Sequence, residues 1–216
     1  MKKNINIIFD LGGVLLNLDF GAIERRFQAL LGNDFFPLFR NLRTQNIFDK
    51  FEVGDFSEEK FLDYFLESGK LTQEEVLTAW NSILLDLPSH RLDFLKKLKK
   101  DYNVYLLSNT NYTHVQKIEA DLKVQYGIQD FRKEFFDIGY YSFEMGMRKP
   151  EKRIFKAVLE DANLIAADTI FIDDNKNNIK SAASLGIQTI LHEANTEIEP
   201  VLMEFLRTAH STRRTA

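Results

Sequence analysis

The sequence predicts an α/β protein built on a doubly wound parallel sheet that carries an all-helical insertion. Three apolar runs, at 6–9, 104–107 and 169–172, each end in polar residues. Helical patterns alternate with the later runs, as is typical of a doubly wound sheet. By contrast, residues 16–85 show helical patterns and no strand pattern. A chain of 216 residues is long enough for a sizeable core and one such insertion.

The first predicted strand delivers a carboxylate to its end. The apolar run 6–9 is followed by Asp10, and Gly12 and Gly13 come next. In an open parallel sheet, ligands bind beyond the carboxyl ends of the strands, and glycine lets the backbone approach a ligand closely. Asp10 is therefore a candidate nucleophile or metal ligand. Taken alone, the pattern also fits an aspartate that caps a turn.

The insertion is rich in phenylalanine and is predicted to consist of helices. We expect them at 21–31, 35–46, 57–67 and 72–84. The last helix begins with Thr72 and Glu75, which have the spacing of a capping box. Several aromatic residues are expected to fill a core of the insertion itself, namely Phe48, Phe51, Phe56, Phe61, Phe65 and Trp80.

The rest of the chain is predicted to complete the sheet and to cover it. Helices are expected at 89–100, 151–160, 178–185 and 197–206, and further strands at 104–107, 135–138, 169–172 and 187–191. Residues 1–15 and 86–206 would then form the α/β core, and 16–85 a separate helical unit. The tail 207–216 has no apolar anchor and is expected to fray.

Polar clusters stand at the ends of two further strands. Ser108 and Asn109 offer a hydroxyl and turn amides to an anion, and Asp173 and Asp174 follow a later strand. Asn178 is expected to support Asp174, although a role at a helix start explains it nearly as well. Because the carboxyl ends of parallel strands meet at one edge, these groups are predicted to converge with the first carboxylate.

Together these residue types point to phosphoryl chemistry. A carboxylate such as Asp10 can attack phosphorus, but it approaches a dianion, so fixed positive charge is needed beside it. Lys149 is a candidate for that charge, because Pro150 suits the first position of a helix and leaves the lysine at the helix mouth. Mg²⁺ prefers oxygen ligands, which Asp10, Asp174 and the backbone carbonyl of Gly12 could provide.

Four segments resemble motifs of the haloacid dehalogenase-like hydrolases, a superfamily dominated by Mg²⁺-dependent phosphatases. They are 9–14, 107–110, 146–151 and 171–175, in the family's order, and the resemblance extends from 5 to 191. Within the family, the chain looks most like the branch that contains the alpha-D-glucose-1-phosphate phosphatases. The resemblance implies a Rossmann-like core, with 16–85 as a helical cap over its catalytic end.

The resemblance also implies roles for single residues. Asp10 would form an aspartyl phosphate, and the substrate would be a small phosphomonoester, most plausibly a sugar phosphate. The implied catalytic residues are Asp10 and Lys149, the phosphate-binding residues Ser108, Asn109 and Lys149, the metal ligands Asp10, Gly12 and Asp174, and the supporting residues Asp173 and Asn178.

One position departs from the family pattern. Most phosphatases of the family carry a second aspartate two residues after the nucleophile, where this chain has Gly12. General acid–base assistance is worth about 10²–10⁴ in rate, so its absence matters. The leaving group could need less protonation or take its proton from water or another side chain. Alternatively, the chain could be a dehalogenase, or a non-catalytic phosphate-binding regulator.

The remaining carboxylates favour the first interpretation. Asp173 and Asp174 are costly to hold near Asp10 without a cation, because like-charged carboxylates raise each other's pKa. A bound metal ion would favour a phosphate ester as the substrate over a halogenated compound. The regulator ranks third, because the nucleophile, the lysine and a metal carboxylate are all present.

Four other residues are weaker candidates. His114 could supply the missing proton, but it lies on a predicted helix with apolar neighbours, which favours a packing role. Asp19 is a second distant candidate for that proton. Glu52 and Asp55, in a predicted turn between cap helices, could bind sugar hydroxyls, although exposure to solvent is the simpler expectation.

Composition limits the function classes. The chain has no cysteine, which excludes disulfides, thiolate zinc sites and a cysteine nucleophile. Its net charge of −4 gives no support for nucleic acid as a partner. No stretch approaches the length of a membrane span, and Asp10 interrupts the apolar run that could resemble a signal peptide. We therefore expect a cytoplasmic monomer or homodimer that binds a small phosphorylated substrate, without nucleic acid or membrane.

Overall fold

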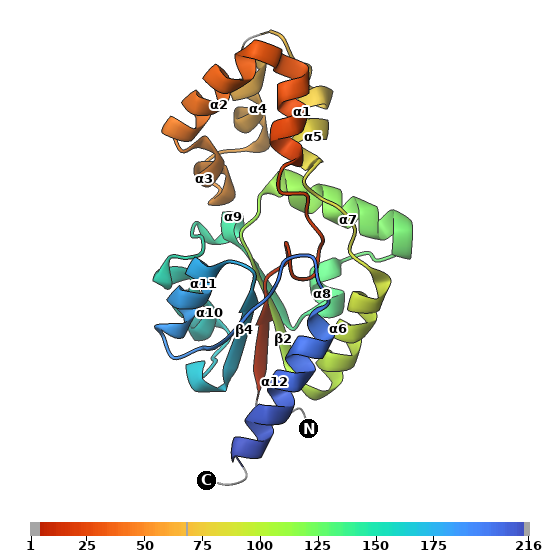
Figure 1. The fold of residues 1–216 in the computed structure, drawn as a ribbon, viewed down its shortest axis with the longest axis vertical. Coiled ribbons are helices and arrows are strands. Elements are labelled where there is room, and N and C mark those ends of the chain that lie inside the picture. The colour runs from red at the N-terminus through yellow and green to blue at the C-terminus, as the bar shows by residue number, and fades with distance from the viewer. Residues whose placement is uncertain (1–4, 68, 214–216) are drawn as a thin grey trace.

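The computed structural model describes residues 5–67 and 69–213 and shows within them a five-stranded, entirely parallel sheet (Figure 1). The strand order is β3-β2-β1-β4-β5. The bounds are β1 Asn6–Phe9, β2 Asn103–Ser108, β3 Ile138–Tyr141, β4 Thr169–Asp173 and β5 Gln188–Leu191. Because all strands run the same way, their carboxyl ends share one edge, with β1 at its centre. The predicted fold class is confirmed.

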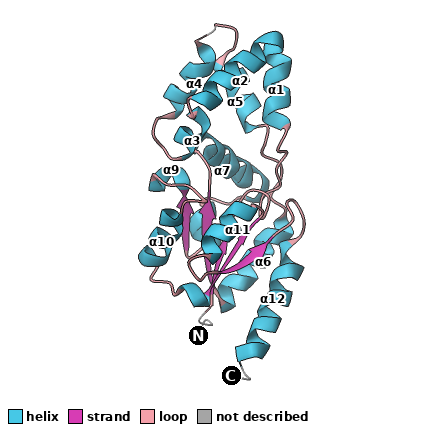
Figure 2. Cartoon of the chain, turned by 60° about the vertical axis from the view of Figure 1, so that its left-hand side comes forward, coloured by secondary structure: helices cyan, strands magenta, loops and turns pink. Residues whose placement is uncertain are grey.

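Helices cover both faces of the sheet (Figure 2). Strand side chains alternate between the faces: Ile7 and Phe9 belong to one apolar cluster, and Ile8 belongs to the other. Helices packed in the first cluster are α6 Ser89–Asp101, α7 Tyr112–Tyr126, α8 Phe131–Phe135 and α12 Ile198–Arg213. Helices in the second are α10 Lys152–Asp161 and α11 Lys176–Ala183. Two short elements, α9 Ser142–Met145 and η2 Ala166–Asp168, complete the core.

The inserted helices form a unit beyond the carboxyl ends of the strands (Figure 1). Its elements are α1 Ala22–Leu31, η1 Gly32–Asp34, α2 Phe35–Thr44, α3 Ile47–Glu52, α4 Glu58–Leu66 and α5 Gln73–Asn81. The predicted capping box between Thr72 and Glu75 is present. The aromatic residues expected to form a separate core do so, and the Phe51 and Phe61 rings stack at 4.1 Å. This separate core supports a distinct helical unit, but its buried residues extend only from Phe27 to Trp80, and Leu16, Leu18 and Leu84 pack in the core of the sheet instead.

The third strand was placed wrongly from the sequence. We expected it at 135–138, but β3 begins at Ile138, and Phe135 ends helix α8. Phe131 and Phe135 are four residues apart, so a helix puts both on one buried face, where their rings lie 5.5 Å apart. Asp130 caps this helix by accepting a hydrogen bond from the Lys133 N–H. The apolar run was therefore helical rather than extended.

Other corrections concern helix ends. Helix α3 was not predicted, and α12 continues to Arg213, through most of the tail that we expected to fray; residues 214–216 lie outside the described residues. Pro150 is not the first residue of α10, because Glu151 still has an extended backbone (φ −60°, ψ 128°). Helix α11 ends at Ala183 rather than at 185. Within 5–67 and 69–213, no helix combines the length and apolar character needed to cross a membrane.

Candidate active site

The ammonium group of Lys149 lies between two carboxylates at the carboxyl ends of the strands. Its Nζ is 2.8 Å from Asp10 Oδ1 and 2.7 Å from Asp173 Oδ2, and it donates to the Leu107 carbonyl at 2.9 Å. Asp10 follows β1, Asp173 ends β4, and Leu107 is the next-to-last residue of β2. An ammonium group has three protons, so all of them are used. The lysine therefore holds the ends of three strands together.

Asn109 fixes the backbone of this lysine. Its side-chain amide donates to the Lys149 carbonyl at 2.8 Å and accepts from the Lys149 N–H at 2.8 Å. We expected Asn109 to bind phosphate, but both ends of its side chain are used to position Lys149. Any contribution of Asn109 to phosphate binding then falls to its backbone.

Asp173 is completely buried and heavily hydrogen-bonded. It accepts from the Asn175 N–H at 2.7 Å, and Asn178 Nδ2 lies 3.0 Å from each of its carboxylate oxygens. Asn178 was expected to support Asp174, and this expectation was wrong. Asn178 is the third residue of α11, from where its amide turns back onto the buried carboxylate. Asp173 is thereby locked as the partner of Lys149.

Asp174 completes a cluster that fits a divalent cation. Ligand oxygens of Asp10, Asp173 and Asp174 all lie within 4.8 Å of one another. Asp174 also packs against Gly13, where an added Cβ would be 2.6 Å from its Oδ2. Gly13 has φ +76°, so glycine is required there for both backbone conformation and space. Three carboxylates face a single ammonium group, and hard oxygen donors of this kind suit Mg²⁺.

Burial makes this excess of negative charge costly. Burial raises the pKa of Asp10 well above its usual value; Lys149 opposes the shift, and the Asp173 charge adds to it. Burial and the Asp173 charge also raise the pKa of Asp174. Burial alone would lower the pKa of Lys149, but the two adjacent carboxylates raise it. A bound cation would relieve the repulsion and favour the ionised carboxylates.

Ser108 ends strand β2, beside the strand that carries Asp10. It is buried, and its hydroxyl lies 3.5 Å from the Asn109 carbonyl, a long contact that a better acceptor could replace. The loop behind it is braced by Ser142, whose hydroxyl accepts from the Thr110 N–H at 2.9 Å and donates to the Thr110 carbonyl at 3.0 Å. Phosphate binding by Ser108 stays a prediction.

His114 is not a proton donor near neutral pH. Its ring stacks on Trp80 of the cap at 5.1 Å, and its Nε2 lies 3.1 Å from the Trp80 carbonyl. Since a carbonyl only accepts, Nε2 carries the proton, and Nδ1 accepts from the Asn111 amide at 3.1 Å. Burial lowers the pKa of His114 to about 4. The packing role is confirmed. Asp19, the other candidate for that proton, forms an ion pair with Arg25.

A contact that the sequence analysis missed joins the lysine loop to the cap. Arg148 forms ion pairs with Asp49 and, at 2.9 Å, with Glu52. Glu52 is therefore not simply solvated, and burial raises its pKa. Arg148 Nε is buried without a hydrogen bond. The only available signal was the position of Arg148 next to Lys149.

Residues 6–186 match the haloacid dehalogenase-like hydrolases. The chain belongs to this family. A D-ribitol-5-phosphate phosphatase from Bacteroides thetaiotaomicron is 30% identical over 195 residues, which span 87% of this chain and 91% of that protein. The predicted family is confirmed, and the chain is a hydrolase.

Solved structures agree with this assignment. A family enzyme from Bacteroides thetaiotaomicron, solved as a magnesium complex, is 37% identical with a TM-score of 0.81, and the match covers 93% of this chain and 99% of that chain. An L-2-haloacid dehalogenase from Xanthobacter autotrophicus is 17% identical with a TM-score of 0.53, and the match covers 88% of this chain and 76% of that one. The latter likeness concerns the fold alone.

Proposed function

We propose that this hydrolase is a Mg²⁺-dependent phosphatase of small phosphomonoesters, and that its substrate is a sugar or sugar-alcohol phosphate. The observation that carries the proposal is the placement of Lys149 between Asp10 and Asp173, with Asp174 in the same acidic cluster. The similarity to a D-ribitol-5-phosphate phosphatase supports the substrate class.

In this mechanism Asp10 is the nucleophile. Its Oδ1 accepts from Lys149 and, at 2.7 Å, from the Leu11 N–H, which leaves Oδ2 as the better attacking atom. Oδ2 bonds to phosphorus while the bond to the ester oxygen breaks, and the departing oxygen takes a proton. Water then hydrolyses the aspartyl phosphate, which releases phosphate and restores Asp10.

The charges around the phosphoryl group come from several residues. Lys149 offsets the negative charge of the nucleophile and the phosphate, while Ser108 and nearby backbone N–H groups bind phosphate oxygens. Asp10, Asp174 and the Gly12 carbonyl would hold Mg²⁺, which when bound neutralises phosphate charge as a Lewis acid. With no acid at Gly12, and with His114 and Asp19 engaged elsewhere, water supplies the proton to the leaving oxygen.

The acidic cluster weighs against the dehalogenase alternative, since halide leaves without a proton or a metal ion. It also weighs against a non-catalytic regulator, because the nucleophile, the ammonium group and the metal carboxylates lie together. A cytoplasmic location and a monomeric or homodimeric state stay predictions.

The test is phosphate release from a panel that includes D-ribitol 5-phosphate, alpha-D-glucose 1-phosphate and p-nitrophenyl phosphate. We expect turnover with Mg²⁺, loss of turnover with a chelator, and no turnover by Asp10→Asn at unchanged thermal stability. Full activity in Asp10→Asn would refute the nucleophile. Metal-independent halide release from 2-chloropropionate would establish the dehalogenase instead.

A further inference from the structure

The two chain segments that join the core to the cap are hydrogen-bonded to each other as an antiparallel ribbon. The Asn17 N–H donates to the Asp86 carbonyl at 2.9 Å, and the Leu85 N–H donates to the Asn17 carbonyl at 3.0 Å. Leu18 and Leu84 form an antiparallel bridge. Residues 16–19 and 83–86, here termed the linker ribbon, therefore move together.

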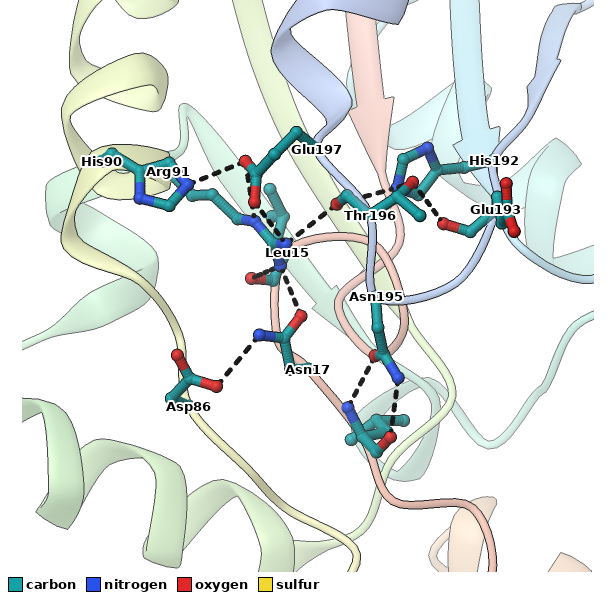
Figure 3. A network of polar contacts seen from close by, with 11 residues as sticks. Leu15, Asn17, Asp86, His90, Arg91, His192, Glu193, Asn195, Thr196 and Glu197 are labelled. Atoms are coloured by element: carbon teal, nitrogen blue, oxygen red, sulfur yellow. Dashed lines mark hydrogen bonds and ion pairs between the residues drawn. The ribbon is translucent and has the colours of Figure 1, made fainter.

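A single side chain from a distant loop holds this ribbon (Figure 3). The amide of Asn195, in the loop after β5, accepts from the Leu18 N–H at 2.8 Å and donates to the Leu18 carbonyl at 2.8 Å. Both bonds are those that a neighbouring strand would make with Leu18. Asn195 thus takes the place of a third strand beside the linker ribbon.

The backbone of Asn195 reaches the turn that follows the nucleophile. Its N–H donates to the Gly13 carbonyl at 2.9 Å. Gly13 in turn packs against Asp174, with no room for a Cβ between them. Asn195 therefore bonds both the linker ribbon and the turn that contains Gly13. The spacing between Asp10 and Asp174 depends on this turn.

The side chain of Leu18 provides a second contact between the linker ribbon and the turn after Asp10. A Cβ added to Gly12 would lie 2.6 Å from Leu18 Cδ1, so the leucine occupies the space beside Gly12. Because Asn195 bonds both backbone groups of Leu18, it also restrains the backbone from which this side chain extends. A shift of the linker ribbon would therefore change the packing of Leu18 against Gly12.

Arg91 of α6 anchors the same loop (Figure 3). Its guanidinium is buried and donates to the Leu15 carbonyl at 3.0 Å, to Asn17 Oδ1 at 2.9 Å and to the Thr196 carbonyl at 2.8 Å. It also pairs with Glu197 at 3.0 Å. The loop that carries Asn195 is thus fixed to the core, so Asn195 bonds the ribbon from a rigid support.

We propose that Asn195 is a positioning residue of the reaction, which keeps the turn after Asp10 in register with the linker ribbon of the cap. Loss of its side chain removes one of the connections between the two segments, while the bond from the Gly13 N–H to the Leu16 carbonyl at 2.8 Å remains, so the segments are held less firmly relative to each other. The spacing of the Asp10, Gly12 and Asp174 oxygens then becomes less well defined. The consequence for Mg²⁺ rests on the function proposed above, whereas the mechanical coupling does not.

The test compares Asn195→Gly with Asn163→Gly. Asn195 and Asn163 both have left-handed backbones, with φ of 62° and 51°, which glycine adopts easily. Asn163 is exposed in the loop after α10, so its replacement controls for the backbone effect. Asn195→Asp keeps an acceptor for the Leu18 N–H but loses the donor to the Leu18 carbonyl.

The coupling is measured without substrate or metal, by amide hydrogen exchange. Asn195→Gly is expected to speed exchange in both segments 11–14 and 16–19, and Asn163→Gly in neither. Faster exchange in 16–19 alone, or in neither segment, would overturn the coupling. This readout holds even if the protein hydrolyses no phosphomonoester, so the two proposals can fail separately.

Calorimetric Mg²⁺ titration and kinetics test the positioning role. We expect Asn195→Gly to weaken Mg²⁺ binding about three- to tenfold and to lower kcat by a similar factor with little change in KM, because two hydrogen bonds are lost. Asn195→Asp should recover part of both, and Asn163→Gly should match the unaltered protein. Equal Mg²⁺ affinity and kcat in Asn195→Gly and Asn163→Gly would overturn the proposal.

Discussion

Arg148 forms an ion pair with Glu52 at 2.9 Å, which connects the residue before Lys149 to helix α3 of the cap. Each of the two side chains is 28% exposed, so the pair is partly shielded from water. Shielded pairs are sensitive to the loss of one partner, because the remaining charge is left without compensation. The contact therefore connects the position of the cap to the residue that precedes Lys149.

Replacing Arg148 should weaken this docking. Discounted for partial exposure, loss of the cation should cost about 1–2 kcal/mol, and we expect Arg148→Met to raise KM about five- to thirtyfold. Steady-state kinetics with Mg²⁺ measures this. Arg153→Met is the matched control, because Arg153 pairs with Glu151 in solvent nearby. Equal KM values in the two variants would show that the cap contact has no such role.

Removing Lys149 should destabilise the protein as well as inactivate it. Lys149→Met leaves Asp10 and Asp173 buried without their cation, which should cost about 3–5 kcal/mol. Urea denaturation without Mg²⁺ measures the loss. Combining Lys149→Met with Asp173→Asn removes one of the two repelling charges and should restore part of the stability but no activity. A double variant no more stable than Lys149→Met would contradict this electrostatic account.

Supplying a carboxyl group at position 12 should speed turnover. Leu18 Cδ1 is the end of a flexible side chain and can move away, so Gly12→Asp should fold. If the leaving oxygen takes its proton from water, an acid there should raise kcat on alkyl phosphates by about tenfold. Gly12→Asn has nearly the same size but donates no proton in this way. Equal rates in the two variants would mean that proton transfer does not limit turnover.

Protonation of His114 should destabilise the fold in mild acid. Its pKa falls from 6.5 in the unfolded chain to about 4 in the folded state, so between these values the unfolded state binds more protons. The contribution of neutral His114 to the stability of the fold is complete above pH 6.5 and is lost progressively as the pH falls towards 4. From pH 7 to pH 5 the loss from this residue should be about 2 kcal/mol.

His114→Phe keeps an aromatic ring against Trp80 but does not titrate. Urea denaturation of both proteins at pH 7 and pH 5 isolates the histidine, since other titrating groups contribute equally to each. The variant should lose about 2 kcal/mol less than the unaltered protein over this interval. Identical losses would indicate that His114 is solvated or charged in the folded state.

Local sequence patterns were sufficient for the sheet and for the main chemical groups. An apolar run followed by Asp10, or by Asp173 and Asp174, predicts a buried strand with carboxylates at its end. This prediction needs only local information, because consecutive apolar residues indicate burial and the residue that follows them marks the end of the strand. The aromatic core of the cap was predicted for the same reason. The pattern failed at 135–138, where phenylalanines at helical spacing resembled a strand.

The partners of those groups were decided by the tertiary structure. Nothing local pairs Asn178 with Asp173 rather than Asp174, directs Asn109 onto the Lys149 backbone or brings Arg148 to Glu52. Asn195 and Leu18 are 177 residues apart and meet only after the sheet has formed. Composition and periodicity specify which surfaces become buried, whereas a hydrogen-bond partner depends on the distance and direction between segments far apart in the chain.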